Sequence, residues 1–338
     1  MEGQMTANGN FKRLVRARAA KTGESYTTAL RHFRPTPTGD VMTETKRVRL
    51  AVAQTIVRED PRNAAELRAS GLEVRRLMRA AHSAGARIVH FPEGAMCFPS
   101  KFVLSVNGPE AVGPADWDRC EWDVLREELR ETARLARSLK LWTVLASAHR
   151  LTPPHQPHNS LYVISDQGEV LTRYDERLLS NTKVTYMYAP GSAPVTFLVD
   201  GVRFGCLLGI EVHFPELFVE YERLGVDCVL FSTTGGSPGN FAVEAQGHAA
   251  ANSYWVSFSV PAQHSAVAPS GVIGPDGDWL AQCPQDGTAS VAVVDLDEGA
   301  ESVEEAVFKA RPWRRTARAG VYEQHFVRDV RSDDRSVF

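Results

Sequence analysis

Hydrophobic and polar residues follow two recurring patterns along the chain from about residue 46 onward. Short apolar runs bounded by turn residues predict β-strands, whereas longer segments with apolar residues three and four positions apart predict amphipathic helices. Strands are expected at 48–54, 87–91, 142–146, 161–165, 170–174, 204–209, 228–232, 255–260, 271–273 and 290–295. Helices are expected at 64–84, 117–140, 215–224 and 239–253.

The order of these elements predicts the fold class. Strands and helices alternate, and the later strands are joined by short turns such as Gly274-Pro-Asp-Gly277. Such an order is typical of packed sheets whose outer faces are covered by helices. We therefore expect an α/β layered body of about 250 residues, which is within the size range of a single large domain.

The first 45 residues have a different character. The segment 11–34 contains seven Lys or Arg residues against a single acid, Glu24, and four of its apolar residues lie on one helical face. The sequence Pro35-Thr-Pro-Thr-Gly39 follows as a linker. We predict a basic helical arm with a Pro/Gly linker at 1–45, a domain at 46–326 and a tail at 327–338. Packing on the body or on a neighbouring subunit, binding of an acidic partner or nucleic acid, and disorder remain alternatives for the arm.

Composition narrows the class of protein. The chain has 338 residues, of which 43% are hydrophobic and 23% charged, and its net charge of −3 argues against a general nucleic-acid binder. Every apolar run is shorter than the roughly 18 residues of a membrane span, and the N-terminus lacks the apolar core of a secretory signal. The five cysteines are scattered and show no Cys-x-x-Cys spacing, so neither a disulfide framework nor a zinc site is expected. These features predict a cytoplasmic protein.

Several short stretches occur in a characteristic order. They are Ala51–Gln54, Phe91-Pro92-Glu93, Arg173–Leu179, Gly209–Glu216, Gly247–Trp255 and the hairpin Gly274–Gly277. Together they resemble the nitrilase, or carbon–nitrogen hydrolase, superfamily over roughly 48–322. The resemblance implies a four-layer α-β-β-α sandwich, a small-molecule substrate and no cofactor. It also implies a homodimer or higher homo-oligomer that pairs through Phe214–Tyr221 and Ala310–Phe326.

The chemistry implied by this resemblance needs three groups. A cysteine thiolate attacks an amide or nitrile carbon to form an acyl-enzyme, and a glutamate transfers the proton. A lysine and the backbone N–H that follows the cysteine stabilise the oxyanion. A second glutamate beyond the lysine orients the set.

This chain retains only part of the set. Glu93 occupies the position of the general base, but the nucleophile position, counted back from Phe214-Pro215-Glu216, is Gly209. The lysine position is Glu176, and the second glutamate position is Lys183, so the two charges are exchanged. The alternative is that Glu176 and Lys183 are surface residues of a diverged loop.

Other residues near these motifs are candidates for the site. The substrate or its oxyanion is expected to meet Ile210, Glu211, His213, Tyr188 and Thr233. Gly209 is expected to enlarge the floor of the pocket. Cys206 lies an odd number of residues from Gly209 on the same strand and is expected in the core, whereas Cys97 is a candidate replacement thiol. No ligand spacing indicates a metal.

These substitutions leave two hypotheses for function. If Glu93 and Glu176 are close together, one carboxyl has a raised pKa, and with Lys183 the site supports acid–base chemistry without a covalent intermediate. The substrate would be a small amide, amine or nitrile, and cyclisation, dehydration and direct addition remain open as reactions. The alternative is a pseudoenzyme, that is, an inactivated amidase used as a binding or scaffolding subunit.

Overall fold

The computed structural model describes residues 46–234 and 240–329. The predicted basic arm and most of the predicted C-terminal tail lie outside these residues. Two six-stranded sheets form the centre of the described part. None of the described helices is long and apolar enough to cross a membrane.

The first sheet has the strand order β12-β1-β2-β3-β4-β5. Its strands are β1 (Arg47–Gln54), β2 (Ile88–His90), β3 (Trp142–His149), β4 (His158–Ile164), β5 (Val170–Asp175) and β12 (Ser290–Asp297). Strands β1, β2 and β3 run parallel, and the other pairs are antiparallel.

The second sheet has the order β11-β10-β9-β8-β7-β6. Its strands are β6 (Thr196–Val199), β7 (Val202–Leu208), β8 (Cys228–Ser232), β9 (Trp255–Ser259), β10 (Gly271–Ile273) and β11 (Trp279–Gln282). Strands β7, β8 and β9 are parallel. Each sheet therefore has a parallel centre, and the ends of these central strands are where α/β proteins usually place functional residues.

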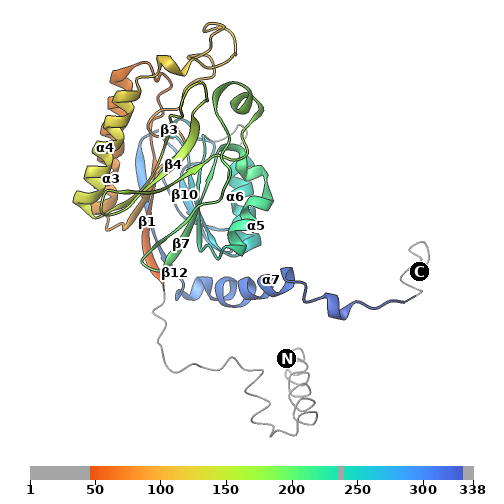
Figure 1. The fold of residues 1–338 in the computed structure, drawn as a ribbon. Helices are drawn as coiled ribbons and strands as arrows, with labels where there is room; N and C mark the ends of the chain where they lie inside the picture. The colour runs from red at the N-terminus through yellow and green to blue at the C-terminus, as the bar shows by residue number, and fades with distance from the viewer. Residues whose placement is uncertain (1–45, 235–239, 330–338) are drawn as a thin grey trace. The chain divides into compact units, whose positions relative to one another are not determined.

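Helices cover the outer faces of both sheets (Figure 1). They are α3 (Ala64–Ser83) and α4 (Trp122–Leu139) on the first sheet, and α5 (Pro215–Arg223) and α6 (Asn240–Asn252) on the second. A further helix, α7 (Arg311–Arg318), follows β12. Shorter helical segments are η1 (Trp117–Arg119), η2 (Lys183–Met187), η3 (Gly209–His213), η4 (Ala262–His264), η5 (Glu301–Val303), η6 (Glu305–Ala310) and η7 (Glu323–His325).

Strand alternation explains why the layers stack. In β1, Leu50 and Val52 belong to the core between the two sheets, while Ala51 and Ala53 belong to the core beneath α3 and α4. Successive side chains of a strand point to opposite faces, so a strand with two apolar faces can be buried on both sides. The predicted α-β-β-α sandwich is confirmed.

The predicted helix at 117–140 is interrupted. Residues Trp117–Arg119 form a single 3₁₀ turn, and α4 begins only at Trp122. The Asp116 carboxylate accepts a hydrogen bond from the backbone N–H of Asp118, which caps the short turn, and Cys120 then adopts an extended conformation. Local capping therefore outweighs the continuous amphipathic pattern at this position.

A buried histidine joins the two sheets just before the site. His90, at the end of β2, lies with its Nδ1 2.9 Å from Ser257 Oγ and its Nε2 2.7 Å from Ser232 Oγ. Burial lowers the pKa of His90 to about 3, so the imidazole is neutral. This contact fixes the position of β2, which leads to Glu93, relative to β8, which leads to Thr233.

Candidate functional site

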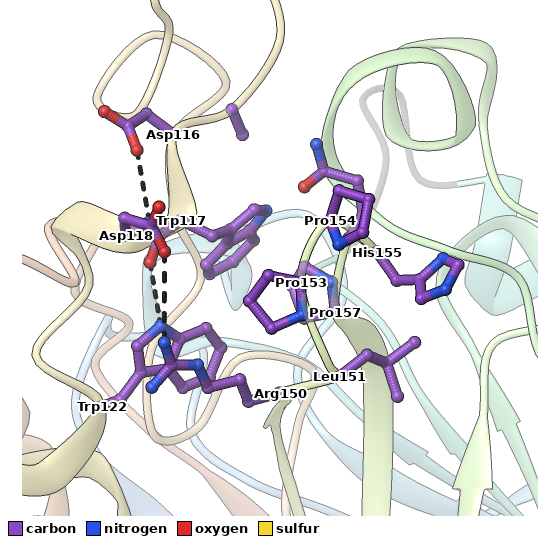
Figure 2. A pocket seen from close by; sticks show the side chains of 12 residues that line it. Asp116, Trp117, Asp118, Trp122, Arg150, Leu151, Pro153, Pro154, His155 and Pro157 are labelled. Atoms are coloured by element: carbon purple, nitrogen blue, oxygen red, sulfur yellow. Dashed lines mark hydrogen bonds and ion pairs between the residues drawn. The ribbon is translucent and has the colours of Figure 1, made fainter.

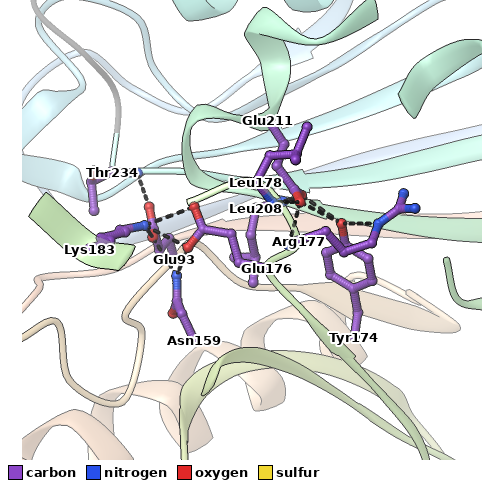
Figure 3. A network of polar contacts seen from close by, with 10 residues as sticks. All are labelled: Glu93, Asn159, Tyr174, Glu176, Arg177, Leu178, Lys183, Leu208, Glu211 and Thr234. Carbon is purple, nitrogen blue, oxygen red and sulfur yellow. Dashed lines mark hydrogen bonds and ion pairs between the residues drawn. The ribbon is translucent and has the colours of Figure 1, made fainter. Parts of the chain in front are cut away.

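Three charged side chains meet beside Gly209 (Figure 3). Glu93 follows β2, Glu176 follows β5, and Lys183 begins η2. Lys183 Nζ lies 2.5 Å from Glu93 Oε1 and 2.8 Å from Glu176 Oε2. Both carboxylates are completely buried and Lys183 is 8% exposed, so the alternative of surface residues on a diverged loop is wrong.

Asn159 is a further member of this cluster. Its Nδ2 donates hydrogen bonds to Glu93 Oε1 at 2.8 Å and to Glu176 Oε2 at 2.6 Å. The same two oxygens accept from Lys183, so two donors bridge the carboxylates from two sides. Sequence reasoning missed Asn159, and the only signal was a polar residue on the face of β4 that carries the apolar Leu161 and Val163.

The cluster contains two carboxylates, Glu93 and Glu176, but only one ammonium, Lys183. The pKa of Glu176 is raised to about 7, chiefly by burial; Lys183 opposes this rise, and the neighbouring carboxylates Glu93 and Glu211 add to it. Burial lowers the pKa of Lys183, but Glu176 and Glu93 more than reverse this effect, so its pKa is raised overall. The two shifts agree physically, because two buried carboxylates share one ammonium. Near neutral pH the ammonium stays charged, and Glu176 is the group that exchanges a proton.

The place of the nucleophile is already occupied. Gly209 has φ +59°, a left-handed conformation that side chains rarely adopt. A Cβ built there would overlap Glu176 Oε1 and would lie 2.9 Å from Lys183 Nζ. The expectation that Gly209 opens room in the floor is therefore wrong, because the Glu176 carboxylate fills that space.

A cavity of about 370 Å³ lies over this cluster. Of the predicted site residues, the lining includes Glu93, Lys183, Tyr188, Gly209, Ile210 and Thr233. Glu176 is not among the residues that line the cavity, but it contacts two of them, Lys183 and Gly209. Glu93 Oε2 accepts a hydrogen bond from the backbone N–H of Thr234 at 3.0 Å, which fixes the carboxylate at the cavity base.

Glu211 lies on the side of Glu176 away from Lys183 and does not line the cavity (Figure 3). Its buried carboxylate accepts hydrogen bonds from Tyr174 Oη and from the backbone N–H groups of Arg177, Leu178 and Leu208. These bonds tie the segment after β5 to the end of β7. The predicted contact with substrate is thus wrong for Glu211, which holds Glu176 beside Gly209.

His213 is also outside the cavity. Its ring is exposed, and its Nδ1 lies 2.7 Å from Glu244 Oε2 on α6. The predicted role in substrate binding is therefore not supported by its position. His213 is the last residue of η3, and α5 begins two residues later at Pro215.

No cysteine replaces the missing nucleophile. All five thiols are buried, and none lines the cavity in the described part of the chain. Burial raises the pKa values of both Cys97 and Cys206 well above the ordinary range of a thiol, so neither provides a thiolate. Within 46–234 and 240–329, no group of three or more His, Cys, Asp or Glu side chains is arranged to hold a metal.

A second cavity, of about 300 Å³, lies between η1 and the loop after β3 (Figure 2). Trp117, Trp122 and three prolines line it, and the Arg150 guanidinium lies 5.4 Å from the Trp122 ring centroid. None of the predicted site residues is among its lining. The centroids of the Trp117 and Tyr188 rings are 5.4 Å apart. Trp117 lines the second cavity and Tyr188 lines the first, so this aromatic pair separates the two.

The chain is similar to several known proteins. The family model described as carbon-nitrogen hydrolase matches residues 48–304. A curated protein named Hydrolase Rv0480c, from Mycobacterium tuberculosis, is 28% identical over 202 residues, which are 56% of this chain and 62% of the relative. The chain therefore spans less than two thirds of that relative's length.

Solved structures show the same fold. An amidase from Nesterenkonia sp. has a TM-score of 0.61 at 18% identity and covers 80% of this chain and 97% of its own. Nit3 from Saccharomyces cerevisiae, a member of branch 10 of the nitrilase superfamily, also has a TM-score of 0.61 at 18% identity, with 79% and 95% covered. Structures of the amidase include complexes with acrylamide and with butyramide.

Proposed function

Because this chain belongs to the carbon–nitrogen hydrolase family, we propose that it acts on a small amide by acid–base chemistry, without an acyl-enzyme on cysteine. One observation carries the proposal. Lys183 Nζ is held by both Glu93 and Glu176 at the base of a cavity, where no thiol is present among the lining residues. A general base and a cation thus remain in place although the nucleophile is absent.

Lys183 acts as a fixed positive charge in this proposal. An amine must be unprotonated to attack a carbonyl, but the raised pKa of Lys183 keeps it an ammonium at neutral pH. A Schiff base or an amine nucleophile is therefore disfavoured. The ammonium can instead stabilise negative charge that develops on an amide oxygen, together with the backbone N–H of Ile210.

Glu93 acts as the base toward water. As the water oxygen bonds to the amide carbon, Glu93 takes the water proton, and the carbonyl oxygen faces Lys183. The C–N bond then breaks, and the proton passes from Glu93 to the departing amine. The products are a carboxylic acid and ammonia or an amine, and no covalent bond to the protein forms.

The test is amide turnover by the full chain. We expect slow release of ammonia from primary amides, lost in Glu93→Gln, with hydroxylamine trapping no acyl-enzyme. Glu169→Gln, which alters an exposed carboxylate in the turn before β5, is the matched control and should behave as the wild type. Equal turnover by wild type and Glu93→Gln would remove Glu93 from the chemistry.

A second function, that of a pseudoenzyme, is favoured by a different observation. The Glu176 carboxylate fills the place of a side chain at residue 209, and the cluster satisfies its own charges. In this case the cavity binds a ligand without converting it. Ligand binding with unchanged affinity in Glu93→Gln, and no product from any amide, would support this reading over hydrolysis.

Assembly and location also remain proposals. We infer a homo-oligomer that pairs through Phe214–Tyr221 and Ala310–Phe326, and a cytoplasmic setting. In the second segment, exposed apolar side chains such as Trp313 and Phe326 support the first proposal. Light scattering of the full chain is the test, and a monomer would contradict it.

A further inference from the structure

We infer that the cavity over Lys183 takes a neutral amide that carries an aromatic group, an inference that rests on the proposed amide site. The proposed reaction leaves the substituent of the amide open, and the side chains that line the cavity select it. Three features of the described residues carry it: the charge at the base, the composition of the walls, and the free hydroxyl of Tyr188.

The base of the cavity offers no uncompensated positive charge. The ammonium of Lys183, the buried lysine of the lining, is paired with both Glu93 and Glu176. The formal charge of these three groups is −1, or zero when Glu176 holds a proton. A carboxylate ligand would meet this negative or neutral cluster in a buried setting, where repulsion is poorly screened. A neutral head group avoids that penalty.

Charges at the rim do not alter this conclusion. Glu59 and Lys101 also line the cavity, but both are exposed and carry opposite charges. Solvent-exposed charges of this kind contribute little. The Lys101 ammonium lies 5.2 Å from the centroid of the Phe102 ring, so it is partly engaged at the wall.

The walls are aromatic. Phe98, Phe102, Phe241 and Tyr188 line the cavity with Met187 and Ile210. The three phenylalanines are only half-buried, so an aromatic ligand would remove further apolar area from water. Aromatic rings also gain from offset or edge contacts with one another. A short-chain amide would leave most of this surface exposed.

Tyr188 provides a polar contact for the head group. Its side chain is 3% exposed, and among the described residues its hydroxyl has no hydrogen-bond partner, although it lines the cavity. Burial raises the pKa of Tyr188 well above its ordinary value, so the hydroxyl keeps its proton and can donate. An amide carbonyl accepts such a bond, which a buried hydroxyl needs.

The experiment measures binding of three probes to the full chain by calorimetry at neutral pH. They are propionamide, phenylpropionamide and phenylpropionate. We expect phenylpropionamide to bind on the order of tenfold or more tightly than propionamide, as burial of a ring predicts. Phenylpropionate, which has the same ring but a carboxylate, should bind at least about tenfold more weakly than phenylpropionamide.

Substitutions of the phenylalanines that line the cavity test whether these side chains cause the preference for the phenyl amide. Phe241→Ala and Phe102→Ala should each weaken binding of the phenyl amide several-fold more than binding of propionamide. Phe98 is unsuitable, because its ring lies 5.6 Å from Lys183 Nζ and its removal would disturb the cluster. Leu72→Ala, on the exposed face of α3, is the control and should bind all probes as the wild type does.

Ammonia release from the same samples separates this inference from the proposed function. A phenyl preference without ammonia would overturn hydrolysis and leave the inference standing. Equal affinity for the two amides with ammonia released from both would overturn the inference and leave hydrolysis standing. Preferred binding of phenylpropionate, or no binding of any probe, would overturn the inference.

Discussion

Glu176 Oε1 lies so close to Gly209 that a Cβ on residue 209 would overlap it, and Lys183 Nζ lies 2.8 Å from Oε2 of the same carboxylate. The three positions are thus linked in space. A cysteine at 209, a lysine at 176 and a glutamate at 183 would form one arrangement, and the glycine, glutamate and lysine of this chain form another. Changing one position alone places incompatible atoms together.

Gly209→Cys by itself should therefore not create a cysteine amidase. The new side chain would need a left-handed backbone and would overlap Glu176, so we expect the free energy of unfolding to fall by about 1–3 kcal/mol. Combination with Glu176→Lys and Lys183→Glu should give an acyl-enzyme detectable by intact-mass spectrometry. Gly225→Ala is the matched control, since Gly225 has φ +73° with nothing within 4 Å and reports backbone strain alone. Activity in the single variant equal to that of the triple variant would contradict the linkage.

Removal of the ammonium tests the charge balance. Lys183→Met leaves two buried carboxylates without a cation, and loss of one partner of a buried ion pair destabilises by about 3–5 kcal/mol. The loss should be larger at alkaline pH, because the carboxylates must then ionise without a counter-charge. Urea denaturation at mildly acid and mildly alkaline pH measures this. The double variant Lys183→Met with Glu176→Gln should recover part of the stability, and no recovery would argue against mutual dependence of the two residues.

Glu211 allows a test of how the site is held together. Glu211→Gln keeps the shape but removes the charge that four donors share, including Tyr174 Oη and the backbone N–H of Arg177. Hydrogen bonds to a charged group are worth about 1.5–3 kcal/mol each, and we expect a loss within that range because the amide keeps some of them. Binding of the amide probe should weaken as well, since Glu176 shifts with its segment. Glu169→Gln, at an exposed position in the turn before β5, should change neither quantity.

The sequence predicted the buried strands well and the shortest edge strands poorly. Strand β8 (Cys228–Ser232) is apolar in all but its last residue and was predicted at its observed bounds. The two edge strands of the second sheet, β6 and β11, were missed because they are short and lack a continuous apolar run, whereas the longer edge strands β5 and β12 of the first sheet were predicted. Helix α7 was missed as well, since four arginines in eight residues leave no apolar stripe.

The site could be predicted only where a residue type is unusual for its place in the chain. Glu93 follows a buried strand and a proline. Glu176 is an acid at a position where a lysine is expected, and Lys183 is a lysine where a glutamate is expected. Asn159 has no such signal, because a lone polar residue in a strand does not show which face it occupies or what it bonds. The filling of the space at Gly209 depends on a side-chain conformation of Glu176, which no local pattern encodes.

Because His90 is buried in its neutral form, we expect the free energy of unfolding to fall as the pH is lowered. Its pKa is about 3 in the folded protein and about 6.5 in the unfolded chain, so between these values the unfolded chain binds more protons. The stability contributed by neutral His90 is therefore present above pH 6.5 and is lost as the pH falls, by at most about 1.4 kcal/mol per pH unit. Glu176 acts in the opposite direction, since its pKa is raised to about 7 and its protonation on acidification favours the folded state.

His90→Asn separates these two contributions. The variant loses bonds to Ser257 and Ser232 and should be less stable at neutral pH, but its stability should fall less steeply from pH 6.5 to about 5 than that of the wild type. His155→Asn, an exposed histidine in the loop after β3, serves as the control and should keep the wild-type slope. Chemical denaturation at a series of pH values measures the slope. Identical slopes for the wild type and His90→Asn would mean that His90 does not carry the acid sensitivity.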